Sequence, residues 1–175
     1  MKQETKLQIA ASIRDFRLPR YHEIPTVGLY LEQATKYVCE YLAPLGEFSL
    51  TPSMISNYVK KGLIANPVKK QYSRDQIAYL FFIAVAKSVL SLDALTGFIK
   101  LQQQTYTLPK AYGYFCEEFE NLLRFTFELQ DTLEMSGEAS TDEKRLLFTC
   151  IVAAVQKVYL EKCLEAIAKE AQDEK

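Results

Sequence analysis

Tryptophan is absent from the 175 residues, and histidine occurs once, at His22. A single histidine with no serine or cysteine close to it in sequence argues against a histidine-dependent catalytic triad. Neither a Gly-rich phosphate loop nor a Gly-x-Ser-x-Gly elbow occurs. Six glycines and six prolines are too few for the many turns of an all-β sandwich. The composition therefore predicts a helical protein that is not an enzyme.

Cysteine is sparse, and none of the four cysteines forms a Cys-x-x-Cys pair. Because no four ligands stand at a known metal-binding spacing, we expect no metal and no cofactor. The sequence shows no secretory leader, which favours a reducing cytoplasm and unpaired, buried thiols. The cysteines are Cys39, Cys116, Cys150 and Cys163.

Long hydrophobic runs are also lacking. The two longest, Ile77–Ala86 and Leu146–Val155, fall well short of the roughly 20 apolar residues that span a bilayer. We therefore expect buried helices and no membrane association. Because Leu146–Val155 is apolar on every face, we expect it to pack on Ile77–Ala86 or on a second subunit.

Charge is unevenly distributed although its net value is only -1. Residues 1–104 hold 13 lysine and arginine residues against 8 acidic ones, whereas residues 105–175 hold 8 against 14. Such asymmetry indicates a part that faces a polyanion, joined to an acidic dimerisation or regulatory part. Between Glu47 and Asp75 no acidic residue occurs. The basic residues of this gap are Lys60, Lys61, Lys69, Lys70 and Arg74.

The basic gap also has the pattern of a helix-turn-helix with a wing. Thr51 is suited to cap a helix and Pro52 to occupy its first position, while Gly62 is suited to end it in the left-handed conformation. A supporting helix is predicted over 28–42, and Val68–Tyr72 is long enough for a small wing. We expect the helix over 52–61 to enter the major groove of double-stranded DNA.

The short polar side chains on one edge of this helix are the expected base contacts, because they can reach base edges. They are Ser53, Ser56, Asn57 and Lys60. The flanking cations are the expected phosphate contacts. They are Lys61, Lys69, Lys70 and Arg74. An ordinary lysine-rich solvated surface is the alternative interpretation of the same residues.

Around this motif the chain divides into three parts. Residues 1–27 form an N-terminal strap, with a short helix over 6–16 and the apolar residues Leu18, Tyr21 and Ile24 pinning it to the body. Residues 28–104 form the winged helix-turn-helix domain, including a helix that opens with a capping box at Ser73. Residues 105–175 hold two long helices, predicted over 112–135 and 141–171, the second opened by a capping box from Ser140 to Glu143.

The C-terminal helix pair carries many aromatic residues. Their helical spacing favours core or dimer contacts, and we expect a homodimer. The alternative is a pocket for a small apolar effector near Tyr112, Phe115 and Phe119.

Several of these residues resemble MerR-type regulators. Tyr58-Val59-Lys60-Lys61-Gly62-Leu63 is similar to the Tyr-x-x-x-Gly-Leu that ends their reading helix, and Asn66-Pro67 resembles the proline after it. Tyr72-Ser73, the helix Ile77–Ala86 and Leu90–Leu95 follow in the order of their wing, third helix and fourth helix. The resemblance covers about residues 28–104 and implies DNA binding as a dimer.

The resemblance has departures. Ser56 and Asn57 stand where MerR-type proteins usually have an arginine and an aromatic residue. Lys69 and Lys70 stand in place of wing arginines, and they lack the bidentate arginine fork.

The whole chain also resembles a small bacterial family of unknown function, the YkrK-like proteins. The likeness rests on Leu18–Tyr21, Ile24-Pro25 and Tyr112–Cys116. We therefore predict an all-α protein with a MerR-like winged helix-turn-helix and a pair of long helices, acting as a cytoplasmic transcription regulator. The alternative function is a protein–protein interaction module that keeps this fold without binding DNA.

Overall fold

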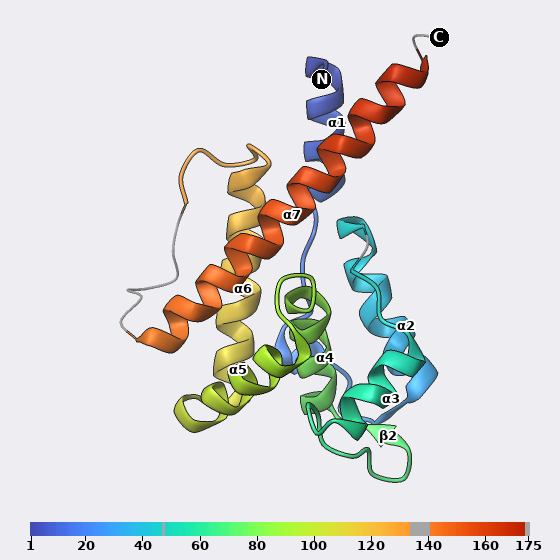
Figure 1. Cartoon of the computed structure of the whole chain (residues 1–175), viewed down its shortest axis with the longest axis vertical. Helices are drawn as coiled ribbons and strands as arrows, with labels where there is room; N and C mark the ends of the chain where they lie inside the picture. Colours follow the sequence, from blue (N-terminus) through green and yellow to red (C-terminus); the bar gives the residue numbers. More distant parts are fainter. Residues whose placement is uncertain (47, 134–140, 174–175) are drawn as a thin grey trace.

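The computed structural model describes residues 1–46, 48–133 and 141–173. Over these ranges the chain forms seven α-helices, two short 3-10 helices and one two-stranded antiparallel sheet (Figure 1), which confirms the all-α class. The α-helices are α1 (Gln3–Ile13), α2 (Leu31–Leu42), α3 (Pro52–Lys60), α4 (Arg74–Ala86), α5 (Leu92–Thr105), α6 (Leu108–Thr126) and α7 (Asp142–Asp173). The short elements are η1 (Tyr21–Glu23), η2 (Ala43–Leu45), β1 (Leu29–Tyr30) and β2 (Gln71–Tyr72). None of the described helices combines the length and apolarity needed to cross a membrane.

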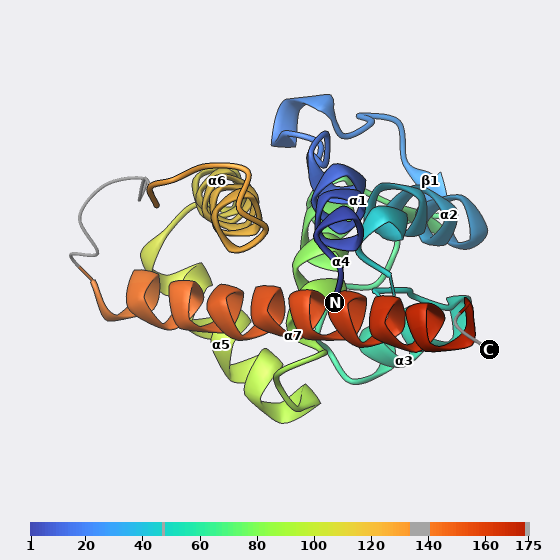
Figure 2. The same cartoon turned by 90° about the horizontal axis from the view of Figure 1, so that it is seen from above.

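Helix α4 lies at the centre of the core because it is apolar on every face. Nine of its thirteen residues are buried, and a helix of this kind must be surrounded by other elements. Helices α2, α6 and α7 all contact it, and the view from above shows α4 between α2 and α6 (Figure 2). Helices α7 and α4, which carry the apolar runs Leu146–Val155 and Ile77–Ala86, thus contact each other.

The start of α4 is fixed by the capping box expected from sequence. Ser73 Oγ accepts a hydrogen bond from the Gln76 amide at 3.4 Å, and Gln76 Oε1 accepts one from the Ser73 amide at 2.8 Å. The other end of the Gln76 side chain donates to the carbonyl of Ala65 at 2.7 Å. This glutamine thus ties the loop that follows α3 to the first turn of α4.

Helix α6 is shorter than the predicted range 112–135 and begins earlier, at Leu108. It ends at Thr126 because Glu128 takes a left-handed conformation, with φ of 56°. The amide of Leu129 then donates to the carbonyl of Arg124 at 2.8 Å, which closes a Schellman motif. The predicted boundary was wrong because glutamate is an unusual residue at this position.

The predicted range of the last helix, 141–171, agrees closely with α7. Thr141 Oγ1 accepts a hydrogen bond from the Lys144 amide at 3.4 Å, so the helix start has a side-chain cap. Met135 and Ser140, which belonged to the predicted helix end and capping box, lie outside the described residues.

The N-terminal strap is held against α6 by a buried carboxylate. Leu18 and Ile24 are fully buried, as expected, whereas Tyr21 is half-buried. Glu120, which is 2% exposed, accepts the Leu18 amide at 2.8 Å and both terminal nitrogens of Arg20 at 2.7 and 2.8 Å. Such a bidentate pair is stronger and more directional than a single contact, so it fixes the strap on α6.

Replacing Arg20 by methionine should destabilise the fold by about 3 kcal/mol, because the Glu120 carboxylate would stay buried without its cation. The matched control is Arg17→Met, which removes an exposed arginine that donates to Glu23 at 2.8 Å and should change stability little. Urea denaturation of both variants measures the difference. Equal losses for the two variants would contradict the assigned importance of burial.

Candidate nucleic-acid interface

Helices α2 and α3 pack together as a helix pair, but the connection between them is long. Residues 43–51 separate them, whereas a helix-turn-helix usually has a turn of three to four residues. The extra residues include η2 and two buried apolar side chains, Phe48 and Leu50. The Leu50 amide donates to Cys39 Sγ of α2 at 3.3 Å. Phe48 and Leu50 therefore anchor this connection in the core.

The start and the end of α3 are fixed by the residues that the sequence pointed to. Thr51 Oγ1 accepts the amide of Met54 at 3.2 Å, and Pro52 opens the helix. Gly62 has φ of 72°, and the Leu63 amide donates to the carbonyl of Tyr58 at 2.9 Å, again a Schellman motif.

The outer edge of α3 is polar and open to solvent, because Ile55 and Tyr58 occupy its buried face. The four residues predicted as base contacts, Ser53, Ser56, Asn57 and Lys60, are all exposed. Ser56 Oγ donates to the carbonyl of Pro52 at 2.9 Å, so this hydroxyl retains only its acceptor capacity. The structure thus brings the four residues to one exposed edge.

The segment predicted as the wing, Val68–Tyr72, forms a tight hairpin turn, and its strand β2 pairs with β1 directly before α2. Strands β1 and β2 pair antiparallel, with Leu29 opposite Tyr72. A Cβ atom on Gly28 would lie 2.8 Å from the Cβ of Gln71, so a glycine is needed for this close approach. The hairpin turn is closed by two hydrogen bonds between Val68 and Gln71, of 2.9 and 3.1 Å.

Lys69 and Lys70 form the two-residue tip of this hairpin. Both have positive φ, 51° and 63°, as a type I′ turn requires, and such turns prefer Asn-Gly. A left-handed conformation costs a side-chain-bearing residue roughly 1 kcal/mol. Two lysines therefore occupy the tip at a cost in conformational energy that Asn-Gly would largely avoid.

The cations of the basic gap differ in how they are used. Lys60, Lys61, Lys69 and Lys70 are exposed, and among the described residues none of them forms an ion pair. Arg74 is half-buried instead. Its Nε donates to the carbonyl of Ile24 at 2.9 Å and a terminal nitrogen to that of His22 at 3.3 Å.

Arg74 also stacks over the Tyr21 ring at 5.4 Å, and the Tyr21 hydroxyl bonds to Asp75. Burial first, and then this hydrogen bond, raise the pKa of Tyr21 to about 12. The strap is thus joined to the start of α4, directly after the wing. No sequence signal identified this contact, because it joins residues about 50 positions apart.

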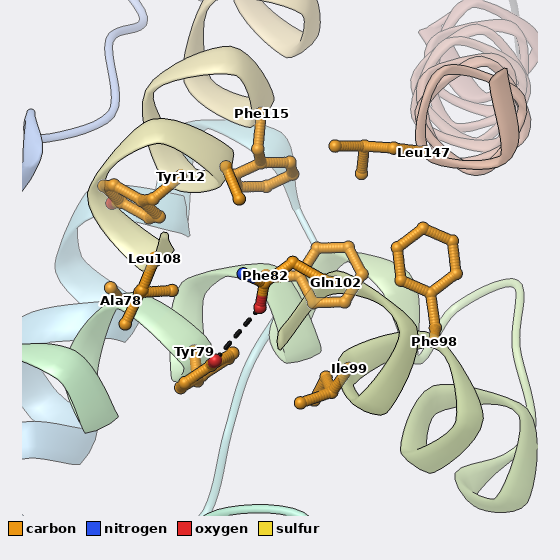
Figure 3. A pocket seen from close by; sticks show the side chains of 11 residues that line it. Ala78, Tyr79, Phe82, Phe98, Ile99, Gln102, Leu108, Tyr112, Phe115 and Leu147 are labelled. Atoms are coloured by element: carbon orange, nitrogen blue, oxygen red, sulfur yellow. Dashed lines mark hydrogen bonds between the residues drawn. The ribbon is translucent and has the colours of Figure 1, made fainter. Parts of the chain in front are cut away.

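The predicted effector residues do not all line one cavity. Tyr112 and Phe115 border a small apolar cavity between α4, α5 and α6 (Figure 3). Phe119 is fully buried and stacks on Phe115, with ring centroids 5.7 Å apart, so it belongs to the core.

The cysteines offer no activated thiol in the core. Burial raises the pKa of Cys116 to about 12 and that of Cys150 to about 11, which keeps both protonated, and a thiol is a poor nucleophile. Over residues 1–46, 48–133 and 141–173 no group of three or more potential metal ligands lies close enough together to hold an ion.

Residues 19–115 match the family described as a domain of unknown function, DUF1836. The chain belongs to this family. The matched range runs from the strap to the first half of α6, and so includes α3 and the wing, but it stops before Glu120 and α7. No curated protein and no solved structure matches the chain.

Replacing the wing tip by Lys69→Asn/Lys70→Gly should stabilise the protein by about 1–2 kcal/mol, because both residues suit positive φ. The free energy of unfolding in urea measures this gain. Lys69→Met/Lys70→Met is the matched control, since it removes the same charges and keeps the strain. A gain of equal size in the control would show that charge repulsion, and not conformation, destabilises the tip.

Proposed function

We propose that this member of the DUF1836 family is a non-enzymatic, cytoplasmic DNA-binding regulator whose α3 and wing act like those of MerR-type proteins. The observation that carries the proposal is the pair of lysines at the strained wing tip. An exposed turn gains no packing from lysine, so their presence is best explained by a polyanion that contacts the tip. Figure 1 places this loop and α3 at the same end of the molecule.

The side chains divide by role under this proposal. The polar edge of α3 reads bases, with Asn57 suited to the paired donor and acceptor of adenine. Lys61, Lys69 and Lys70 neutralise phosphates on either side of α3. Arg74 already donates to two strap carbonyls, so we assign it a smaller share of the phosphate contacts than the lysines.

The resemblances noted in the sequence support this reading to different degrees. The MerR likeness includes the helix end at Gly62, which has the required left-handed conformation. The wider likeness to YkrK-like proteins concerns the strap and the start of α6, and it adds no activity to the proposal.

A homodimer belongs to the proposal, because two half-sites on DNA are read by two copies of a reading helix. Helix α7 offers a surface for it. Leu160, Leu164 and Ile167 follow helical spacing and are 56%, 56% and 45% exposed, on the side of α7 that faces away from the core. An apolar stripe of this kind on a long helix is suited to pairing with a second helix.

Charge reversal at the wing tip, Lys69→Glu/Lys70→Glu, should weaken binding to a pool of random-sequence duplexes roughly tenfold or more. It should also lower the steepness of the salt dependence by about two per protomer, because each phosphate contact contributes about one. Asn57→Ala should instead change which sequences are enriched from the pool and leave the salt dependence unchanged. Titrations at several salt concentrations, followed by sequencing of the bound fraction, give both results.

The charge-matched control for this experiment is Lys36→Glu/Lys100→Glu, on exposed sites of α2 and α5. It changes the net charge equally and should bind as the unmodified protein does. If both double variants weakened DNA binding equally, the loss would come from net charge alone, and the wing would have no specific role in binding. Failure of the unmodified protein to bind any duplex at low salt would favour the protein-interaction alternative.

The dimer can be tested at α7. Leu160→Lys/Leu164→Lys should convert a dimer into a monomer in sedimentation equilibrium, because four lysines would meet in the paired stripe. Leu7→Lys, at a leucine of α1 that is 62% exposed, is the control and should remain dimeric. A monomeric unmodified protein would contradict this part of the proposal and leave the DNA contacts untouched.

A further inference from the structure

A cleft of about 360 Å³ lies between α5, the first half of α6 and the first turns of α7. Its volume is within the range of small-molecule sites. Phe98 and Leu101 of α5, Tyr114 of α6 and Leu147 of α7 supply much of its apolar wall. Helices α5 and α6 are consecutive in the sequence, whereas α7 begins only at Asp142, so the cleft exists only when α7 packs against the other two.

The inner end of the cleft is apolar. A smaller cavity of about 40 Å³ shares Phe98, Gln102 and Leu147 with it and extends toward α4. Figure 3 shows Phe82, Phe98, Phe115 and Leu147 around this space. The side-chain amide of Gln102 is already satisfied there, because its Oε1 accepts the Tyr79 hydroxyl at 3.0 Å and its Nε2 donates to the Tyr106 carbonyl at 2.7 Å. The inner end therefore suits an apolar side chain.

The outer rim carries both signs of charge. Lys110, Glu117, Glu143 and Lys144 all line the cleft, and within the described chain none of the four forms an ion pair. Lys110 Nζ lies 5.3 Å from the centre of the Tyr106 ring, and Lys144 Nζ lies 5.4 Å from that of Tyr114. Two lysines and two glutamates thus lie at the same rim and form no ion pairs with one another.

Tyr114 adds an unsatisfied polar group. Its hydroxyl is buried and has no hydrogen-bond partner among the residues that the structure describes, and a buried polar group without a partner costs free energy. Tyr114 also forms part of the cleft wall.

The charge pattern selects a class of ligand. A purely anionic head group would be repelled by Glu117 and Glu143, and a purely cationic one by the two lysines. A head group with both charges is matched by this rim, with its carboxylate toward the lysines and its ammonium toward the glutamates. We propose that the cleft binds a zwitterionic small molecule with an aromatic or branched apolar side chain, of the free amino acid class. This inference does not depend on DNA binding.

Because the chain contains no tryptophan, indole compounds can be followed by their own fluorescence against the full-length protein. The matched series is tryptophan (zwitterion), tryptamine (cation), indole-3-propionate (anion) and 3-methylindole (uncharged). Tryptophan should bind with the highest affinity, and removal of either charge should weaken binding roughly tenfold. Phenylalanine and leucine should displace tryptophan, which shows that the apolar body and not the indole ring is recognised.

Gly113 provides a variant that fills the cleft. It lines the cleft within α6, and a Cβ atom there would meet no atom within 4 Å. Gly113→Leu should therefore abolish tryptophan binding without destabilising the helix, since leucine is a better helix former than glycine. Gly97→Leu is the matched control, because Gly97 is also helical and open but does not line the cleft. It should bind as the unmodified protein does.

The rim charges are tested separately. Lys144→Met should weaken only the compounds that carry a carboxylate, and Glu117→Gln only those that carry an ammonium group. Equal affinity for all four indoles, or unchanged binding by Gly113→Leu, would overturn the proposal. So would the absence of tryptophan binding together with no shift of the thermal midpoint by phenylalanine or leucine.

Discussion

The burial of α4 on all its faces is the constraint on which the rest of the structure depends. A helix with one apolar stripe is satisfied by one neighbouring layer, whereas α4 requires cover from every side. Helix α2, which precedes α4 in the chain, covers part of its surface, and α6 and α7, which follow α4, cover other parts. The basic first half and the acidic second half of the chain therefore share one hydrophobic core, although their charges differ so strongly.

The strap extends this constraint to the surface. At one end of the strap, the Leu18 amide donates to the buried Glu120 of α6 and Arg20 forms an ion pair with it. At the other end, the Ile24 carbonyl accepts a hydrogen bond from Arg74 at the first turn of α4. Two arginines thus hold one extended segment at two points, one on each half of the chain. The family match begins within this segment, at residue 19, which is consistent with the strap being an integral part of the fold.

How far sequence could predict the structure is seen best at the two Schellman motifs. Gly62 and Glu128 occupy the same position at the ends of α3 and α6, with φ of 72° and 56°. Glycine signals such an end because it lacks the steric penalty, whereas glutamate resembles an ordinary helical residue. The sequence therefore predicted where α3 ends and extended α6 too far. The local sequence was therefore sufficient to predict the end of α3 but not the end of α6.

The candidate sites divide in a similar way. The exposed edge of α3 follows from helical periodicity within ten residues, so it was predictable. The cleft between α5, α6 and α7 depends on side chains from three helices, and no local pattern encodes their juxtaposition. The position of Arg74 was missed for the same reason, because its partners lie in the strap. The positive φ angles of Lys69 and Lys70 had no signal, since Asn-Gly is the usual mark of such a turn.

The wing tip distinguishes between explanations of the basic surface. If lysines were there only for solubility, nearly any exposed position would serve, and a residue pair suited to positive φ would leave the hairpin more stable. Lysine at both central positions of the tight turn instead places two positive charges side by side at the tip of the hairpin. A polyanion with regularly spaced charges benefits from such a point in proportion to the counterions that binding releases. An acidic protein partner benefits through fewer, irregularly placed contacts. The dependence of binding on salt concentration therefore separates the two partners on physical grounds, even before any specific sequence or partner is identified.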